Sequence, residues 1–177
     1  RATYELAQSY LRTNETDKAK ALLLTLKQRF PSTEYAKGAN YYIGQMALNN
    51  AIAGLPGAQD DPLPLTSAVQ NFRDYLKGST SGRFSAEVAD KLMSLNAGTV
   101  QTASGSTLQI PPLTADDLDL IGLVYYKKND YNKALSLWQK AGSNRNFQKA
   151  QCLGKLGKRT EAVEMLLDAI AKDPAAT

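Results

Sequence analysis

The stretch that decides the fold is residues 122–138, GLVYYKKNDYNKALSLW, in which a polar turn separates two apolar helical patterns. Tyr125 lies nine residues before Ala134, and Trp138 lies four residues after it. Asp130 stands at the turn, where an acidic residue favours the start of a helix because its carboxylate accepts a free backbone N–H. The stretch therefore predicts two antiparallel helices joined by a short turn.

The same spacing recurs elsewhere in the chain. Two further copies share an apolar residue, an alanine nine positions later and a large apolar residue after four more: Tyr10, Ala19 and Leu23, and Leu153, Ala162 and Leu166. Pro31 and Pro174 follow these two alanines by twelve positions, where proline stops a helix. A less regular copy contains Ile43 and Gly44, and its second helix, with Phe72, comes about a dozen residues late. The chain is thus predicted to be an array of helix pairs.

These offsets resemble those of the tetratricopeptide repeat (TPR) family. The resemblance implies an all-α fold, a right-handed superhelix of antiparallel helix pairs (a TPR-like α-solenoid) with about nine helices. Small residues on the first helices let the second helices approach closely, and successive pairs must stack because one pair cannot bury its apolar stripe. The residues expected at the tight contacts are Ala7, Gly44, Gly122 and Ala150, and those expected in the core are Phe72, Tyr75 and Trp138.

Periodicity and turn residues also predict the organisation of the chain. We expect helices over 2–13, 17–30, 33–50, 65–78, 84–96, 114–128, 130–141, 145–156 and 159–172. They form an N-terminal block, 1–96, with an inserted loop near 53–64, and a C-terminal block, 114–177. Residues 97–113 are expected to be a linker, because they are rich in Gly, Ser and Thr and contain the proline pair Pro111-Pro112 near their end.

The composition argues against several functions. The chain has no histidine and one cysteine, Cys152, so Ser-His and Cys-His catalysis, a zinc site and an internal disulfide are not expected. Asp60-Asp61 lacks the alternating oxygens of a calcium loop, and Asp116-Asp117 is interpreted as the first turn of a helix capped by Thr114. We therefore predict no catalytic residues, no metal and no cofactor. The sequence contains no stretch of about 18 or more apolar residues, so no membrane span is expected.

The exposed faces of the first helices are the candidate binding surface. In TPR-like folds these faces line a concave groove, and here they carry tyrosines and amides at recurring offsets. Such residues suit an extended peptide, because aromatic rings give rigid contact area and amides bond to its backbone. The predicted groove residues are Tyr4, Gln8, Arg12, Tyr41, Gln45, Asn49, Tyr126, Lys127, Phe147 and Gln151, with Asp119, Leu123, Asn144 and Lys155 on the same faces. The alternative is that Tyr4, Tyr41 and Phe147 pack between neighbouring helices.

The first hypothesis for function is a non-catalytic scaffold that binds a protein or peptide partner. Residues 29–36 and 41–44 resemble bacterial cell-envelope repeat proteins, and residues 72–76 and 81–84 are similar to the superhelical arm of soluble lytic murein transglycosylases. That resemblance implies a periplasmic or envelope location and peptidoglycan-associated partners, with catalysis in a separate domain. RNA binding is a weaker alternative, based on 10 basic and 5 acidic residues over 125–177. Apolar stripes on the end helices leave a homodimer open.

Overall fold

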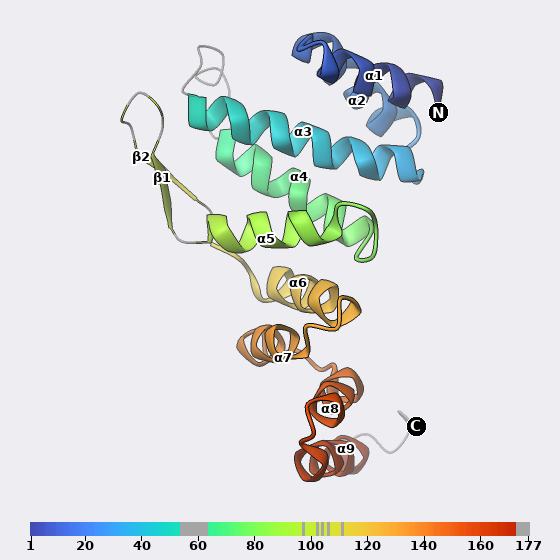
Figure 1. Ribbon diagram of the computed structural model, residues 1–177, viewed down its shortest axis with the longest axis vertical. Helices are drawn as coiled ribbons and strands as arrows, with labels where there is room; N and C mark the ends of the chain where they lie inside the picture. Colours follow the sequence, from blue (N-terminus) through green and yellow to red (C-terminus); the bar gives the residue numbers. More distant parts are fainter. Residues whose placement is uncertain are drawn as a thin grey trace. The chain divides into compact units, whose positions relative to one another are not determined.

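The computed structural model describes residues 1–53, 64–96, 98–101, 103, 105, 107–110 and 112–172. The chain divides into two compact units, unit 1 (Arg1–Pro112) and unit 2 (Leu113–Thr177). Its described residues contain nine α-helices and one two-stranded sheet, which confirms the predicted all-α fold of helix pairs (Figure 1). The Asp60-Asp61 pair, most of the predicted loop at 53–64, and Pro174 lie outside the described residues. A membrane-crossing helix is not found in the part of the chain that is described.

Unit 1 consists of two helix pairs, a further helix and a small hairpin. Its elements are α1 (Ala2–Arg12), α2 (Thr16–Arg29), α3 (Glu34–Ala53), α4 (Pro64–Gly78), α5 (Ser85–Leu95), β1 (Thr99–Gln101) and β2 (Thr107–Gln109). Helix α1 packs against α2, α3 packs against α4, and α2 joins the two pairs by packing against α3. Helix α5 packs against α4. Each contact joins helices that are neighbours in sequence, as expected for stacked repeats.

Unit 2 consists of two helix pairs. Its helices are α6 (Ala115–Lys127), α7 (Tyr131–Lys140), α8 (Asn146–Lys155) and α9 (Arg159–Lys172). Helix α6 pairs with α7, α8 pairs with α9, and α7 packs against α8. The predicted role of the aspartate pair in the first turn of α6 is also confirmed. Thr114 accepts a hydrogen bond from the backbone N–H of Asp117, and the Asp117 carboxylate accepts one from the backbone of Thr114.

Three turns between paired helices have the same geometry. Each contains one residue with positive φ: Asn14 (62°), Asn129 (63°) and Gly157 (82°). Asparagine and glycine tolerate this left-handed conformation better than other residues. One residue later, a backbone N–H donates to the carbonyl five positions back, that of Tyr10 (2.8 Å), Tyr125 (2.9 Å) or Leu153 (2.9 Å). These bonds close the first helix of each pair, at the same residues that reveal the repeat in the sequence.

Close approach of the paired helices depends on glycine at two positions. A Cβ atom at Gly44 would lie 2.7 Å from Cε1 of Phe72, and one at Gly122 would lie 2.6 Å from Nε1 of Trp138. Both rings are fully buried. The other predicted contact residues, Ala7 and Ala150, are 0% and 3% exposed, and Tyr75 is buried as well. The predicted tight contacts and core residues are therefore confirmed.

On the first helix of each pair, the residue directly before the small contact residue differs in burial from one pair to the next. At this position Ile43, Ile121 and Lys149 are 5%, 0% and 9% exposed. The equivalent Leu6 in α1, which no described helix precedes, is 46% exposed. Within each unit, the hairpin that precedes Ile43 or Lys149 therefore accounts for the burial of that residue.

The predicted linker at 97–113 contains regular structure that the sequence analysis missed. Strands β1 and β2 pair antiparallel, with Thr99 opposite Gln109 and Gln101 opposite Thr107. Gly105 has a positive φ of 81° between them, and the backbone N–H of Ala103 donates to the carbonyl of Ile52 at 2.8 Å. Three-residue strands rich in threonine give too short a pattern for period-two alternation to be recognised. The sequence analysis placed no strand in this segment.

Candidate functional site

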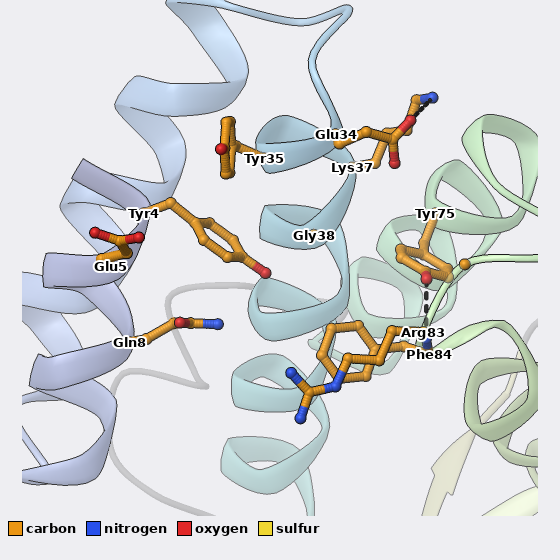
Figure 2. A pocket seen from close by; sticks show the side chains of 11 residues that line it. Tyr4, Glu5, Gln8, Glu34, Tyr35, Lys37, Gly38, Tyr75, Arg83 and Phe84 are labelled. Carbon is orange, nitrogen blue, oxygen red and sulfur yellow. Dashed lines mark hydrogen bonds and ion pairs between the residues drawn. The ribbon is translucent and has the colours of Figure 1, made fainter. Parts of the chain in front are cut away.

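A cleft of about 350 Å³ opens in unit 1 between α1, the N-terminal half of α3 and the turn that joins α4 to α5 (Figure 2). We call it the unit-1 cleft, and the lining residues used below are Tyr4, Gln8, Tyr35, Gly38, Arg83 and Phe84. Helix α1 supplies the first two, α3 the next two and the turn the last two. The cleft is thus built from three segments that the hairpin stacking brings together.

Tyrosine side chains form the wall of the cleft on the α1 and α3 side. The ring of Tyr4 lies 5.5 Å from that of Tyr35 and 6.0 Å from that of Tyr42, measured between centroids. The Tyr4 ring lies against Gly38, where a Cβ atom would be only 2.4 Å from the Tyr4 hydroxyl. Gln8 Nε2 donates to the Tyr42 hydroxyl at 3.0 Å. Burial, followed by the neighbouring Tyr42, raises the pKa of Tyr4, so its hydroxyl stays protonated at neutral pH.

The turn on the opposite wall is held by buried aromatic contacts. The backbone N–H of Phe84 donates to the Tyr75 hydroxyl at 3.0 Å. The Phe84 ring stacks on Tyr41 with centroids 3.9 Å apart and an interplanar angle of 2°. Tyr41 donates in turn to Glu87 at 2.8 Å. The Arg83 guanidinium lies over the Phe84 ring, 5.3 Å from its centroid. The turn is therefore fixed to α3 and α4 through Phe84.

Residues 1–33 match the model of one known family, described as tetratricopeptide repeat. They hold α1 and α2 and the turn with positive φ between them. The turns before α7 and α9 repeat this positive φ, and the α3–α4 and α6–α7 pairs share the contact between a glycine and a buried ring. The described helix pairs form a TPR-like helical repeat. No curated protein matches the chain.

A second cleft lies within unit 2 of this TPR-like protein. Its volume is about 400 Å³, and its lining comprises Tyr126, Tyr131, Gln151, Gly154 and Lys155. The Tyr126 hydroxyl donates to Gln151, and its ring lies 6.1 Å from that of Tyr131. We call this the unit-2 cleft. It resembles the first cleft in chemistry, because both combine tyrosines with a glutamine on first helices.

The structure brings some of the predicted groove residues together and separates others. Tyr4 and Gln8 line the unit-1 cleft, and Tyr126, Gln151 and Lys155 line the unit-2 cleft. Exposed residues outside the lining of both clefts are Arg12, Asn49, Lys127 and Phe147.

Tyr41 and Gln45 lie differently from the surface positions that register predicts. Tyr41 is 8% exposed because Phe84 covers its ring, so it packs between elements as the alternative interpretation holds. Gln45 is half-buried, and its Oε1 atom is buried without a hydrogen-bond partner. Tyr41 therefore supports the Phe84 ring, and neither Tyr41 nor Gln45 lines the cleft.

Sequence reasoning missed Tyr35, Arg83 and Phe84 as cleft residues. Tyr35 lies in the first turn of α3, and the other two precede α5. None of them occupies a repeat offset, so the repeat pattern has no means of placing them. Their chemistry gave one signal, since arginine and aromatic residues are enriched at protein interfaces.

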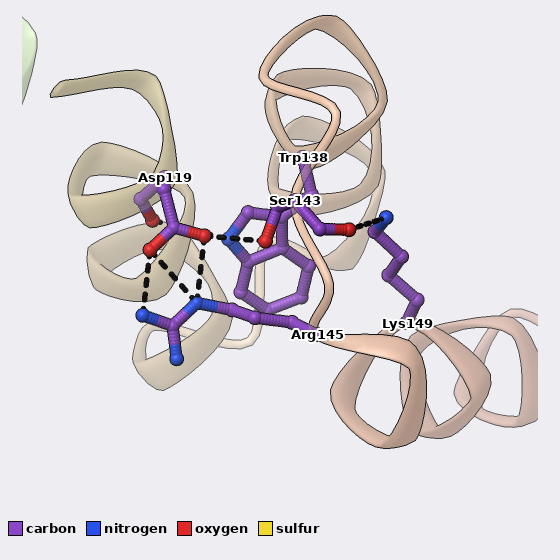
Figure 3. Close-up of polar contacts among 5 residues, drawn as sticks. All are labelled: Asp119, Trp138, Ser143, Arg145 and Lys149. Atoms are coloured by element: carbon purple, nitrogen blue, oxygen red, sulfur yellow. Dashed lines mark hydrogen bonds and ion pairs between the residues drawn. The ribbon is translucent and has the colours of Figure 1, made fainter. Parts of the chain in front are cut away.

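Asp119 on α6 has a structural role in unit 2 instead of facing a groove (Figure 3). The single N–H of Arg145 Nε is shared between both carboxylate oxygens, at 2.8 and 3.0 Å, and Arg145 Nη2 donates to Oδ2 at 2.6 Å. The carboxylate also accepts a bond from the Ser143 hydroxyl, and the Asp119 carbonyl accepts one from Trp138 Nε1. Burial acts to raise the pKa of Asp119, but the bonds from Arg145 and Ser143 outweigh it and hold the pKa below its usual value. Asp119 therefore ties α6 to the turn before α8.

Lys149 is the charged residue at an otherwise apolar repeat position. Its ammonium group donates to the carbonyl of Ser143, and burial lowers its pKa. The long aliphatic stem covers apolar surface while the ammonium reaches a polar partner. This explains how the position accepts a lysine where other repeats have isoleucine or leucine.

Proposed function

We propose that this chain is a non-catalytic scaffold that binds an extended segment of another protein in the unit-1 cleft. The observation that carries the proposal is the tyrosine wall of this cleft, on the first-helix face of a TPR-like repeat. TPR repeats are typically protein-interaction modules, and the match of residues 1–33 to that family supports the same class of function here.

The chemistry of the wall suits a peptide. Tyr35 is 36% exposed, so its ring presents apolar area and a polar edge at the mouth of the cleft. Tyr4 is held in place by its ring contacts with Tyr35 and Tyr42. Rigid aromatic residues contribute much of the affinity of protein interfaces, because little side-chain entropy is lost when they bind.

The unit-2 cleft is proposed as a second contact site. It combines two of the predicted groove residues, Tyr126 and Gln151, with the exposed ammonium group of Lys155. A partner that engages both clefts would gain affinity through effective concentration. Separate variants in the two clefts distinguish binding at both clefts from binding at one cleft alone.

A narrower proposal concerns the cellular setting. The sequence resemblance at residues 29–36 and 72–76 supports a bacterial cell-envelope protein with peptidoglycan-associated partners, including the superhelical accessory region of a lytic transglycosylase. Fractionation of source cells with an antibody against the chain tests it. Recovery in the cytoplasmic fraction alone would remove this narrower proposal and leave the scaffold proposal unchanged.

The scaffold proposal is tested with a random dodecapeptide library displayed on phage. The library is selected on the wild-type chain and on the Tyr35→Ala and Gln151→Ala variants. We expect enriched peptides on the wild type and loss of most of them on Tyr35→Ala, with helicity by circular dichroism unchanged. Leu24→Ala is the matched control, because Leu24 is 39% exposed in the same unit and does not line the cleft. Equal enrichment on the wild type and both cleft variants would contradict the proposal.

A further inference from the structure

We propose that the unit-1 cleft selects a segment that places a carboxylate on the Arg83 guanidinium, next to an apolar or aromatic side chain against the tyrosine wall. The inference rests on the proposed function and specifies the chemistry of the partner. It is carried by the pattern of paired and unpaired charges around the cleft.

The other charges on the cleft wall are already paired. Glu5 meets Arg1 at 2.7 Å, and Glu34 meets Lys37 at 2.6 Å. Arg83 differs, because no carboxylate lies within ion-pair distance of it in the part of unit 1 that the structure describes. The cleft thus presents one positive charge without a counter-charge.

Glu87, in the first turn of α5, is the first acidic residue after Arg83 in the sequence. It is engaged elsewhere. One of its carboxylate oxygens accepts the Tyr41 hydroxyl at 2.8 Å and lies 3.4 Å from Lys91 Nζ. The arrangement therefore leaves the Arg83 guanidinium for a group supplied from outside the chain.

The guanidinium is also held in a defined place. It lies over Phe84, whose ring and backbone are fixed by Tyr41 and Tyr75. Figure 2 shows it directed away from the turn and toward α1, on the same side as Gln8. A planar guanidinium fixed in this way can form two parallel hydrogen bonds to a carboxylate with little further loss of freedom.

The surrounding charges favour a carboxylate over a more highly charged anion. Glu5 and Glu34 line the same cleft as Arg83; Glu34 pairs with Lys37, which also lines it, and Glu5 pairs with Arg1 directly before α1. A phosphate group, with close to two negative charges at neutral pH, would meet stronger repulsion from these carboxylates than a group with one charge. A single arginine bordered by acidic residues therefore matches one carboxylate.

The inference is tested first by charge reversal in the same phage selection. On the wild type we expect Asp or Glu near an aromatic or aliphatic residue in the enriched dodecapeptides. On Arg83→Gln the acidic preference disappears, and on Arg83→Glu it changes to Lys and Arg. Arg29→Gln is the matched control, because Arg29 is exposed at the end of α2, carries the same charge and does not line the cleft.

The second arm uses one synthetic peptide with the enriched sequence, labelled with fluorescein and measured by anisotropy. Arg83→Gln in the protein and Glu-to-Gln in the peptide should each weaken binding about tenfold or more, the effect of removing a hydrogen bond to a charged group. The two changes together should weaken it little further. Free and amidated C-termini show whether the chain end or a side chain supplies the carboxylate.

The outcomes separate the inference from the function on which it rests. Peptides that require Tyr35 but show no acidic preference would overturn the carboxylate proposal and leave the scaffold proposal unchanged. Tighter binding of a phosphoserine version of the peptide would also overturn it. If no peptide were enriched on the wild type over the Tyr35→Ala variant, both the carboxylate proposal and the scaffold proposal would be wrong.

Discussion

The contact between Gly122 and Trp138 gives the sharpest prediction. In Gly122→Ala the new methyl group would lie 2.6 Å from Nε1 and 2.7 Å from Cδ1 of the indole, whereas ordinary van der Waals contact begins at 3.4 Å. Trp138 is fully buried and donates to the Asp119 carbonyl at 3.1 Å. The ring must therefore move within a packed core, and the hydrogen bond must lengthen.

Three effects set the magnitude. Replacing glycine by alanine inside a helix stabilises it by about 1 kcal/mol. Overpacking a core costs about 1–3 kcal/mol, and loss of the indole hydrogen bond adds about 1 kcal/mol. We therefore expect Gly122→Ala to lower the free energy of unfolding by about 1–3 kcal/mol after the helix term is subtracted.

Gly154→Ala is the matched control, because it is the same substitution in the neighbouring helix α8 and, apart from its chain neighbours and the backbone of its own helix, no atom lies within 4 Å of the new Cβ. This variant should be more stable than the wild type by up to about 1 kcal/mol. Trp138 is the one tryptophan of the chain, so its fluorescence reports urea unfolding of unit 2 in both variants. If Gly122→Ala were as stable as Gly154→Ala, with unchanged emission, the close-contact argument would be refuted.

Two further predictions concern titratable groups in unit 2. Because the folded pKa of Asp119 is lowered, its stabilisation is present above the unfolded value of 3.8 and is lost as the pH falls through the folded pKa. Asp119→Asn should lower the free energy of unfolding near neutral pH by about 1–3 kcal/mol. The variant should also lose less stability than the wild type as the pH falls. Identical pH profiles of the two proteins in urea titrations would contradict the Asp119 network. Burial raises the pKa of Cys152 to about 11. Its thiol should therefore not react with Ellman's reagent at about pH 8 until urea unfolds unit 2, and fast reaction of the folded protein would show that the thiol is accessible.

The helices and their pairing could be predicted from the sequence because both depend on local patterns. A residue such as Asn129, which tolerates positive φ, ends one helix, and an acidic residue such as Asp130 begins the next. The glycine and tryptophan at Gly122 and Trp138 then fix how closely the helices approach. These signals lie within about 20 residues of each other, so the chain can be interpreted one hairpin at a time.

The candidate site was predicted only in part because it depends on contacts between distant segments. Tyr4 and Gln8 were found, since they occupy repeat offsets that face the cleft. Tyr41 occupies an equivalent offset, but Phe84, more than 40 residues later, covers it. The same long-range contact positions Arg83. The position of a residue in the repeat predicts which face of its helix it occupies. It does not predict whether a distant segment covers that face.

Phe84 belongs to the core through one contact and to the cleft through another. It stacks on the buried Tyr41, and it lies beneath the guanidinium of Arg83. A mutation of this ring would therefore reduce both the stability of the fold and the binding of a partner. Divergence of partner preference in this lineage is therefore expected to proceed through Arg83 or Tyr35, whose replacement alters what the wall recognises and leaves the core intact.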